Sequence, residues 1–252
     1  MADAPAGDIV SAAILVIGDE ILSGRTKDKN IGYIAEYMTA IGIDVREVRV
    51  VPDVEDEIVA ALNALRARYT HVFTTGGIGP THDDITADAV AKAFGVSIDV
   101  DPRAVALLLE RIPKAELNEA RLRMARIPAG AALIENSVSR APGFSIGNVH
   151  VMAGVPMIMQ AMLDALAPGL KTGRAVLSRS IAAGMKEGDI AAPYGVVQRD
   201  FPDVSMGSYP SYQEGVGFTT MLVLRARDVQ RLDAAEAAVR VMLETVRAQR
   251  AR

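Results

Sequence analysis

Apolar residues in the first two thirds of the chain form short continuous runs that alternate with stretches of helical spacing. The runs predict strands at Ala13–Ile17, Asp44–Val51, His71–Thr75 and Val149–Met152. Apolar residues spaced three or four apart predict helices at 31–41, 53–68, 85–94, 102–111, 115–124 and from 156 onward. This order is typical of an α/β domain whose largely parallel sheet carries helices on both faces.

The pattern changes near residues 167–174, where the string APGLKTGR is rich in proline and glycine and is typical of a linker. The predicted elements beyond it are a strand, a helix, two strands and an amphipathic helix, at Val176–Ile181, Asp189–Arg199, Val204–Ser208, Phe218–Ala226 and Val229–Arg247. We therefore expect two domains, at 1–170 and 175–252, of which the second is a small α/β domain.

Composition narrows the classes of function. The 252 residues include no cysteine, which excludes thiol nucleophiles, CxxC redox pairs and cysteine-ligated zinc or iron–sulfur clusters. With 27 basic and 31 acidic residues and only 4% aromatic residues, the chain lacks the features of a nucleic-acid-binding protein. Its first ten residues hold no Lys or Arg, and its longest early apolar run, Ala12–Ile17, is too short for a bilayer. We expect a cytoplasmic protein with neither a membrane nor a nucleic-acid partner.

Polar side chains and glycines directly follow the first and third predicted strands. The first loop carries Gly18, Asp19 and Glu20, and Asn30 stands at its far end. The third loop, TTGGIGPTHDD, supplies Thr75, Gly76, Gly77, Gly79, Pro80, Thr81, Asp83 and Asp84. Because the carboxyl ends of parallel strands meet at one edge of a sheet, we expect both loops to line one site.

The residue types in the third loop indicate phosphate chemistry. Glycines let the backbone approach a phosphate closely, and the N-terminus of the following helix offers free N–H groups and a positive dipole. Carboxylates beside a phosphate favour a divalent metal, here through Asp83 and Asp84 with Asp19 or Glu20 assisting. These features predict a phosphoester or nucleotide site. Simpler interpretations stay open: Asp83 or Asp84 could cap a helix, and Asp19 and Glu20 could be solvated loop charges.

Two further observations limit the site. The third loop is not a Walker A motif, since no GK[ST] follows, nor a Rossmann GxGxxG, since His82 replaces the last glycine. ATP-driven motors and NAD-dependent dehydrogenases are therefore disfavoured. Asp53 follows Pro52, and we expect it to cap the next helix in a loop outside the site.

The two loops resemble the signature of the molybdopterin-binding MoaB/Mog-like superfamily. The most similar branch holds the competence/damage-inducible protein A (CinA) family and the N-terminal domain of FAD synthases. The strings that carry the resemblance are GDEILSG at 18–24 and TTGGIGPTHDDIT at 74–86. Further similar strings lie at 135–137, 141–144, 154–156, 184–191 and 207–210. The resemblance covers nearly the whole chain and implies a three-layer α/β/α domain followed by a small α/β domain.

The resemblance also implies an activity, namely metal-dependent hydrolysis of the pyrophosphate bond in ADP-ribose or FAD, which gives AMP. The implied cofactors are a divalent ion (Mg, Mn or Co), held by Asp83 and Asp84, and potassium. The implied nucleotide-binding residues are Gly18, Asn30, Thr75, Gly76, Gly77, Gly79, Pro80, Thr81, Asn136, Pro142, Gly143 and Gly154. We expect a small-molecule nucleotide or pterin as ligand, and a homo-oligomer, either a dimer or a trimer.

Two departures from the branch keep other functions open. The usual Leu-Pro-Gly-Val-Pro has Met152 and Ala153 at its first two positions, and Ile158 replaces the usual Glu two residues after it. The alternatives are a non-catalytic molybdopterin-binding protein and an adenylyl transferase of molybdenum cofactor biosynthesis. Longer members of the branch carry a C-terminal amidohydrolase domain, and because this chain stops at Arg252 we expect no such activity.

Overall fold

Strand β1 (Val10–Ile17) lies inside a six-stranded sheet, because nearly all of its side chains are apolar and buried. The computed structural model describes residues 9–213 and 217–250 and gives this sheet the order β2-β1-β3-β8-β7-β6. The other strands are β2 (Ile43–Val51), β3 (His71–Thr75), β6 (Ala132–Ile134), β7 (Gly143–Ile146) and β8 (Val149–Met152). The first four strands in this order are parallel, and β7 is antiparallel to both of its neighbours, β8 and β6, which confirms a largely parallel sheet.

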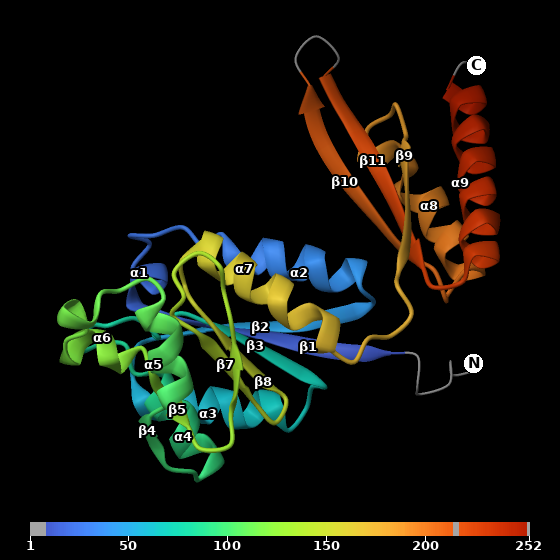
Figure 1. Cartoon of the computed structure of the whole chain (residues 1–252). Coiled ribbons are helices and arrows are strands. Elements are labelled where there is room, and N and C mark those ends of the chain that lie inside the picture. Colours follow the sequence, from blue (N-terminus) through green and yellow to red (C-terminus); the bar gives the residue numbers. More distant parts are fainter. Residues whose placement is uncertain (1–8, 214–216, 251–252) are drawn as a thin grey trace. The chain divides into compact units, whose positions relative to one another are not determined.

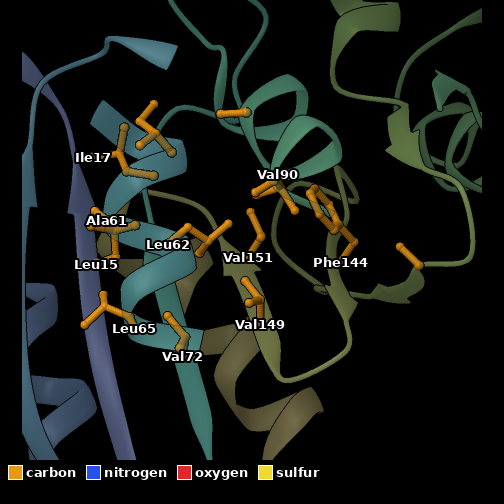
Figure 2. Packing of buried hydrophobic residues seen from close by; sticks show 14 of the residues in the cluster. Leu15, Ile17, Ala61, Leu62, Leu65, Val72, Val90, Phe144, Val149 and Val151 are labelled. Carbon is orange, nitrogen blue, oxygen red and sulfur yellow. The ribbon is translucent and has the colours of Figure 1, made fainter. Parts of the chain in front are cut away.

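Helices cover both faces of the sheet, so the predicted three-layer α/β/α fold is confirmed (Figure 1). The covering helices are α2 (Asn30–Ala40), α3 (Glu55–Arg66), α4 (Thr86–Phe94) and α7 (Pro156–Leu166). Alternate side chains of β1 point to opposite faces. Leu15 and Ile17 belong to the core packed by α3 and α4, part of which Figure 2 shows. Ile14 and Val16 belong to the core packed by α2 and α7.

The segment between α4 and β6 differs from the predicted pair of helices. Its elements are β4 (Ile98–Val100), α5 (Pro102–Leu109), the 3-10 turn η1 (Lys114–Glu116), α6 (Glu119–Arg123) and β5 (Arg126–Pro128). The single helix predicted at 115–124 is wrong, because the Asn118 side chain accepts the Arg121 N–H at 3.0 Å and starts a new helix there. The antiparallel pair β4–β5 has too few residues to show a period in the sequence.

The chain divides into two compact units between Gly173 and Arg174. The elements of the second unit are β9 (Leu177–Ala182), α8 (Glu187–Asp200), β10 (Ser205–Gln213), β11 (Gly217–Ala226) and α9 (Val229–Arg250). They follow the predicted order and form an antiparallel sheet, β10-β11-β9. Strand β10 continues past its predicted end at Ser208, because its polar second half pairs with β11 from Tyr209 opposite Met221 onward.

Two short elements complete the first unit: α1 (Asp19–Leu22) and η2 (Ala167–Gly169). The first directly follows β1 and therefore stands at the edge where the predicted site lies. Within residues 9–213 and 217–250, no helix has the length and apolar character needed to cross a membrane.

Candidate functional site

Four parallel strands, β2, β1, β3 and β8, end at one edge of the sheet, and the loops after them carry most of the predicted site residues (Figure 1). The loop after β1 starts at Gly18 and enters α1, whose first residues are Asp19 and Glu20. The loop after β3 starts at Gly76 and leads to α4, and the loop after β8 contains Gly154. The predicted gathering of these loops at one edge is therefore observed.

Asp53, in the loop after β2, belongs to the same edge, which overturns the expectation that it caps a helix outside the site. Helix α3 begins at Glu55, with Val54 as its N-cap residue and no side-chain cap bond. The Asp53 Oδ2 atom instead accepts a hydrogen bond from the Asp19 N–H at 2.9 Å. The sequence pattern favoured a cap because an Asp before an acidic helix start is typical of one. Nothing local in the sequence indicates the position of the Asp19 amide.

Asp53 feels the negative charges of three other carboxylates, Asp19, Glu20 and Asp83, and we call these four residues the acidic cluster. Burial raises the pKa of Asp53, and the negative charges of Asp19, Glu20 and Asp83 raise it further, while the bond from the Asp19 N–H opposes the rise. In the described part of the chain, Asp19, Glu20 and Asp53 have no ion-pair partner. Such crowding of like charges is unfavourable until a cation enters.

Asp83 and Asp84 differ in their surroundings. The Asp84 Oδ2 atom accepts hydrogen bonds from the Thr81 N–H at 2.8 Å and from the Thr81 hydroxyl at 2.6 Å. Asp84 does not cap α4, whose N-cap residue is Ile85 without a side-chain bond. The Asp83 side chain is 62% exposed, and its oxygen lies 4.0 Å from the exposed ring of His82. Asp84 therefore holds the loop together, and Asp83 is the more accessible carboxylate.

Contacts within the protein require the first two glycines of the third loop. Gly76 and Gly77 have φ angles of 104° and 66°, which side chains disfavour. A Cβ atom at Gly76 would lie 2.1 Å from the Ile17 carbonyl oxygen, and one at Gly77 would lie 2.1 Å from the Thr86 hydroxyl. That hydroxyl donates to the Gly76 carbonyl at 2.9 Å and fixes the loop on α4. The bend of the loop is thus explained without a phosphate.

The enclosed space behind the third loop is too small for a phosphate. Its volume is about 10 Å³, roughly enough for one water molecule. Gly79, Asp84, Arg123 and Pro142 are among the residues that line it, and Arg123 donates to the Asp84 carbonyl at 3.1 Å. The opposite side of the loop is open, and Pro80, Thr81 and Asp83 are exposed there.

A larger cavity of about 230 Å³ lies on the α2 side of the same edge. Glu20, Asn30, Thr75 and Gly154 line it, so residues predicted from three separate loops meet in one place. The Asn30 Nδ2 donates to the Gly154 carbonyl at 2.8 Å. The first free N–H groups of α2 are already bound to the Asp28 carboxylate, and the N-terminus of this helix is not open to a phosphate.

Packing explains two other predicted binding residues. The Asn136 Nδ2 donates to the Ala141 carbonyl at 2.6 Å, and its Oδ1 accepts the Ser139 N–H at 2.7 Å, so this amide closes a turn. A Cβ atom at Gly143 would lie 2.3 Å from the Val151 carbonyl oxygen, which shows that β7 needs glycine there to pack on β8. Neither residue lines the 230 Å³ cavity.

The carboxylates at this edge of the sheet suit a metal ion that binds together with a phosphate. They suit a metal ion held by the protein alone less well. Among residues 9–213 and 217–250, no group of three or more acidic or histidine side chains is arranged to hold a metal ion. Mg²⁺ is usually bound through one or two carboxylates, with substrate phosphates and water as the other ligands. The acidic cluster, with Asp83 exposed, suits this second mode.

The two departures from the family pattern lie against the apolar core. Ile158 and Ala153 are partly buried beside the cluster that α2 and α7 cover. The Ala153 N–H points to the Met162 sulfur at 3.4 Å. An apolar side chain therefore stands where the branch carries a Glu.

Comparison with known proteins shows what the chain is similar to. Residues 13–172 match the family described as probable molybdopterin binding domain, and residues 175–251 match the middle domain of FAD synthase. A Pyrobaculum calidifontis protein is 35% identical over 211 residues, which are 79% of this chain and 80% of that protein. A Caldivirga maquilingensis protein is 36% identical over 196 residues, which are 75% and 76% of the two chains.

A solved structure agrees with these matches. The crystal structure of the protein CinA, with unknown function, from Thermoplasma acidophilum is 36% identical and has a TM-score of 0.61. The similarity covers 64% of this chain and 98% of that one. The resemblance drawn from the two loops is thereby confirmed. The chain belongs to the probable molybdopterin-binding domain family, as a CinA-like member with an FAD synthase middle domain after it.

Proposed function

We propose that this protein hydrolyses the pyrophosphate bond of an adenine dinucleotide such as ADP-ribose or FAD, with a divalent metal, and releases AMP. The supporting observation is the acidic cluster at the carboxyl edge of the sheet, beside the 230 Å³ cavity. The cluster attracts a cation together with its phosphates, and the cavity has room for one part of the nucleotide. Both lie where open α/β sheets bind their ligands.

The chain's own residues have separate roles in this proposal. Water adds its oxygen to one phosphorus, the bond from that phosphorus to the bridging oxygen breaks, and two monophosphates leave. Asp53 accepts the proton of the water, and the Asp19 N–H holds its carboxylate in place. Asp83, with Asp19 or Glu20, holds the metal, which when bound neutralises charge on the phosphoryl oxygens. Asp84 keeps the loop ordered through Thr81.

Product analysis with the full chain tests the proposal. ADP-ribose and FAD are each incubated with Mg²⁺, Mn²⁺ or Co²⁺, with and without K⁺, and AMP is measured by chromatography. We expect AMP in at least one metal and none after addition of EDTA. No AMP under any of these conditions would reject the hydrolysis.

A non-catalytic molybdopterin-binding protein is the second candidate, and two observations favour it. The described residues form no metal site of three ligands, and Ile158 lies against the core where the branch carries a Glu. This function predicts micromolar binding of molybdopterin without turnover. An adenylyl transferase would in addition consume ATP and release pyrophosphate, which separates it from simple binding.

A further inference from the structure

Exposed aromatic side chains gather at the end of the β10–β11 hairpin in the second unit. Every exposed aromatic residue in the described part of the chain lies there: Tyr209, Tyr212 and Phe218, which are 55%, 67% and 63% exposed. Tyr212 and Phe218 stand opposite each other on the two strands, with ring centroids 5.2 Å apart. Residues 205–224 include one charged residue, Glu214, although 23% of the whole chain is charged. The hairpin end therefore lacks the polar surface that solvent-facing strands normally have.

The end of this hairpin is a two-stranded ribbon, because β9 pairs only with Met221–Ala226 of β11 (Figure 1). Side chains alternate between the two faces of a strand, so Phe218 points to the same side as Leu222 and Leu224. Those two leucines belong to the core that α8 and α9 cover. Tyr212, which is paired with Phe218, therefore also points to the helix-bearing side of the sheet, and both rings stay exposed there. We call Tyr212 and Phe218 the aromatic knob.

A groove of about 650 Å³ lies between α8 and α9 of the same unit. Pro193 and Val196 line it from α8, and Val241 lines it from α9. Val196 and Val241 are 48% and 62% exposed, so the walls of the groove present open apolar surface. The charged residues that line it are Asp189 and Arg250, and these two form an ion pair with each other. The groove therefore suits an uncharged, apolar partner.

We propose that the aromatic knob of one chain docks in the α8–α9 groove of a second copy, and that the second copy returns the same contact. Both features lie on the helix-bearing side of the sheet, so a two-fold axis can bring each knob to the groove of the other copy. A one-way contact would leave a knob free on one copy and a groove free on the other, and further copies would add to them. The reciprocal contact closes the assembly as a dimer.

The buried area favours the reciprocal contact over the one-way contact. An aromatic side chain loses roughly 150–250 Å² of surface when it is fully covered. The two side chains of the knob are 67% and 63% exposed. Together with the groove surface that covers them, they account for on the order of 500 Å² in one contact. Two contacts reach about 1,000 Å², the lower limit for a specific interface, whereas one contact does not.

Because the chain contains no cysteine, two single-cysteine variants can report this contact directly. Full-length Phe218→Cys and Val241→Cys proteins are mixed, treated with a short bismaleimide, and the joined peptides are identified by mass. A product that contains one cysteine of each kind can come only from contact between copies. The control mixture replaces Val241→Cys by Val229→Cys, at the start of α9, where the side chain is 47% exposed and does not line the groove. We expect several-fold more mixed product with Val241→Cys, and equal yields in the two mixtures would overturn the proposal.

Sedimentation of the full chain measures what the contact contributes to association. Val241→Asp places a charge in the apolar groove and should weaken association roughly tenfold or more, with an unchanged melting temperature because the side chain is 62% exposed. Val229→Asp should associate like the original protein. An unchanged association constant in Val241→Asp, or a chain that stays monomeric at roughly 100 μM, would overturn the proposal. Binding of such a monomer to phosphatidylcholine vesicles, lost in Phe218→Ser, would assign the knob to a lipid surface instead.

Discussion

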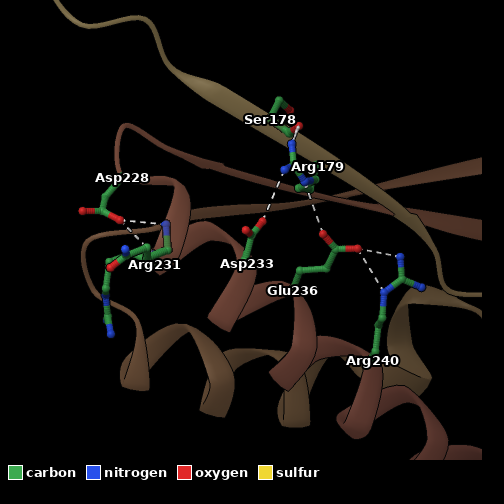
Figure 3. A network of polar contacts seen from close by, with 8 residues as sticks. Ser178, Arg179, Asp228, Arg231, Asp233, Glu236 and Arg240 are labelled. Carbon is green, nitrogen blue, oxygen red and sulfur yellow. Dashed lines mark hydrogen bonds and ion pairs between the residues drawn. The ribbon is translucent and has the colours of Figure 1, made fainter.

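Two carboxylates of the second unit, Asp233 and Glu236, pair with arginines, whereas Asp53 of the acidic cluster in the first unit is surrounded by negative charge. On α9, Asp233 pairs with Arg179 at 3.2 Å, and Glu236 contacts both Arg179 at 3.4 Å and Arg240 at 2.6 Å (Figure 3). In the acidic cluster, the neighbouring negative charges raise the pKa of Asp53 instead. Asp233 and Glu236 are therefore compensated by arginines, whereas among the described residues Asp53 has no ion-pair partner.

This difference in charge compensation distinguishes carboxylates of the structural framework from carboxylates of the candidate site. Ion pairs as exposed as that of Arg179, whose side chain is 40% exposed, contribute little to stability. Uncompensated carboxylates reduce stability, and proteins retain such groups where a ligand or metal supplies the missing charge. Charge compensation thus identifies the sheet edge of the first unit as the candidate site.

The largest expected effect is that of acid, which should destabilise the first unit more than the second because the first unit contains a buried histidine pair. The Ser145 hydroxyl lies 2.9 Å from His150 Nδ1, His150 Nε2 lies 3.1 Å from His71 Nδ1, and His71 Nε2 lies 3.0 Å from the Lys171 carbonyl. Because that carbonyl only accepts, His71 Nε2 carries a proton. His71 Nδ1 is then unprotonated and accepts a hydrogen bond from the Nε2–H group of His150. If His71 were protonated at Nδ1, its N–H group would face the N–H group of His150. This chain of hydrogen bonds therefore requires both imidazole rings to be neutral.

Burial lowers the pKa of His71 and lowers that of His150 to about 4, with a further contribution from His71. The unfolded chain takes up these protons near its ordinary pKa of about 6.5, so the stabilisation is complete above that pH and decreases toward pH 4. We expect the first unit to lose roughly 3 kcal/mol from His150 by pH 4. Hydrogen exchange between pH 7 and pH 4 should show this loss, and His150→Phe should remove most of it.

The second unit is the internal control for this experiment, because its sequence contains no histidine. Its exchange protection should hardly change between pH 7 and pH 5.5, a range in which few carboxylates titrate. Equal losses in both units over that range would show that the histidine pair is not the cause.

Asp83→Asn should lower the catalytic activity by removing one negative charge from the acidic cluster. Asparagine keeps the size of the side chain but lacks the charge that a hard divalent cation requires. Release of AMP should fall about a hundredfold, the scale expected when ~2.7 kcal/mol of transition-state stabilisation is lost. The melting temperature should hardly change, because the side chain is 62% exposed. Asp233→Asn, at a paired carboxylate of the second unit, should retain full activity, and an Asp83→Asn protein as active as the original would remove Asp83 from the mechanism.

Asp53→Asn should raise the stability of the protein and lower its activity. The raised pKa means that the folded state holds the Asp53 proton more tightly than the unfolded chain, so ionisation at neutral pH destabilises the fold. Asparagine removes that charge and can still accept the Asp19 N–H. After allowance for solvent screening, we expect a gain of a few tenths of a kcal/mol, or roughly 1–2 °C in melting temperature. AMP release should decrease.

Calorimetry at two pH values checks the sign of this effect. The gain should be present at pH 7 and disappear near pH 3, where Asp53 is protonated in both the folded and unfolded states. A lower melting temperature at pH 7 would mean that the Asp53 charge stabilises the fold, which contradicts the proposed crowding.

Glu236→Gln should have the smallest effect. The variant keeps the length of the side chain and removes the charge that faces Arg179 and Arg240. We expect the free energy of unfolding to change by less than about 0.5 kcal/mol, and the change to decrease further in 0.5 M salt. Urea unfolding at two salt concentrations measures it. A loss as large as that expected from the histidine pair would show that the second unit depends on this network.

The sequence by itself determined the architecture of this protein and the sheet edge at which its polar loops gather. Strands β3 and β8 have the bounds predicted from their apolar runs, since burial on both faces of a sheet leaves a continuous local signal. The meeting of Asp19, Asp83 and Gly154 at one edge followed from the alternation of strands and helices, because parallel strands end on the same side.

Tertiary structure alone decided which polar atoms meet. Asp53 accepts the Asp19 N–H because β2 and β1 are neighbours in the sheet, a pairing between residues far apart in the sequence. The Asn30 side chain reaches the Gly154 carbonyl across 124 positions. Periodicity and capping are local, so they report which face a residue occupies. Partners across strands depend on strand order and loop path, which no local pattern contains.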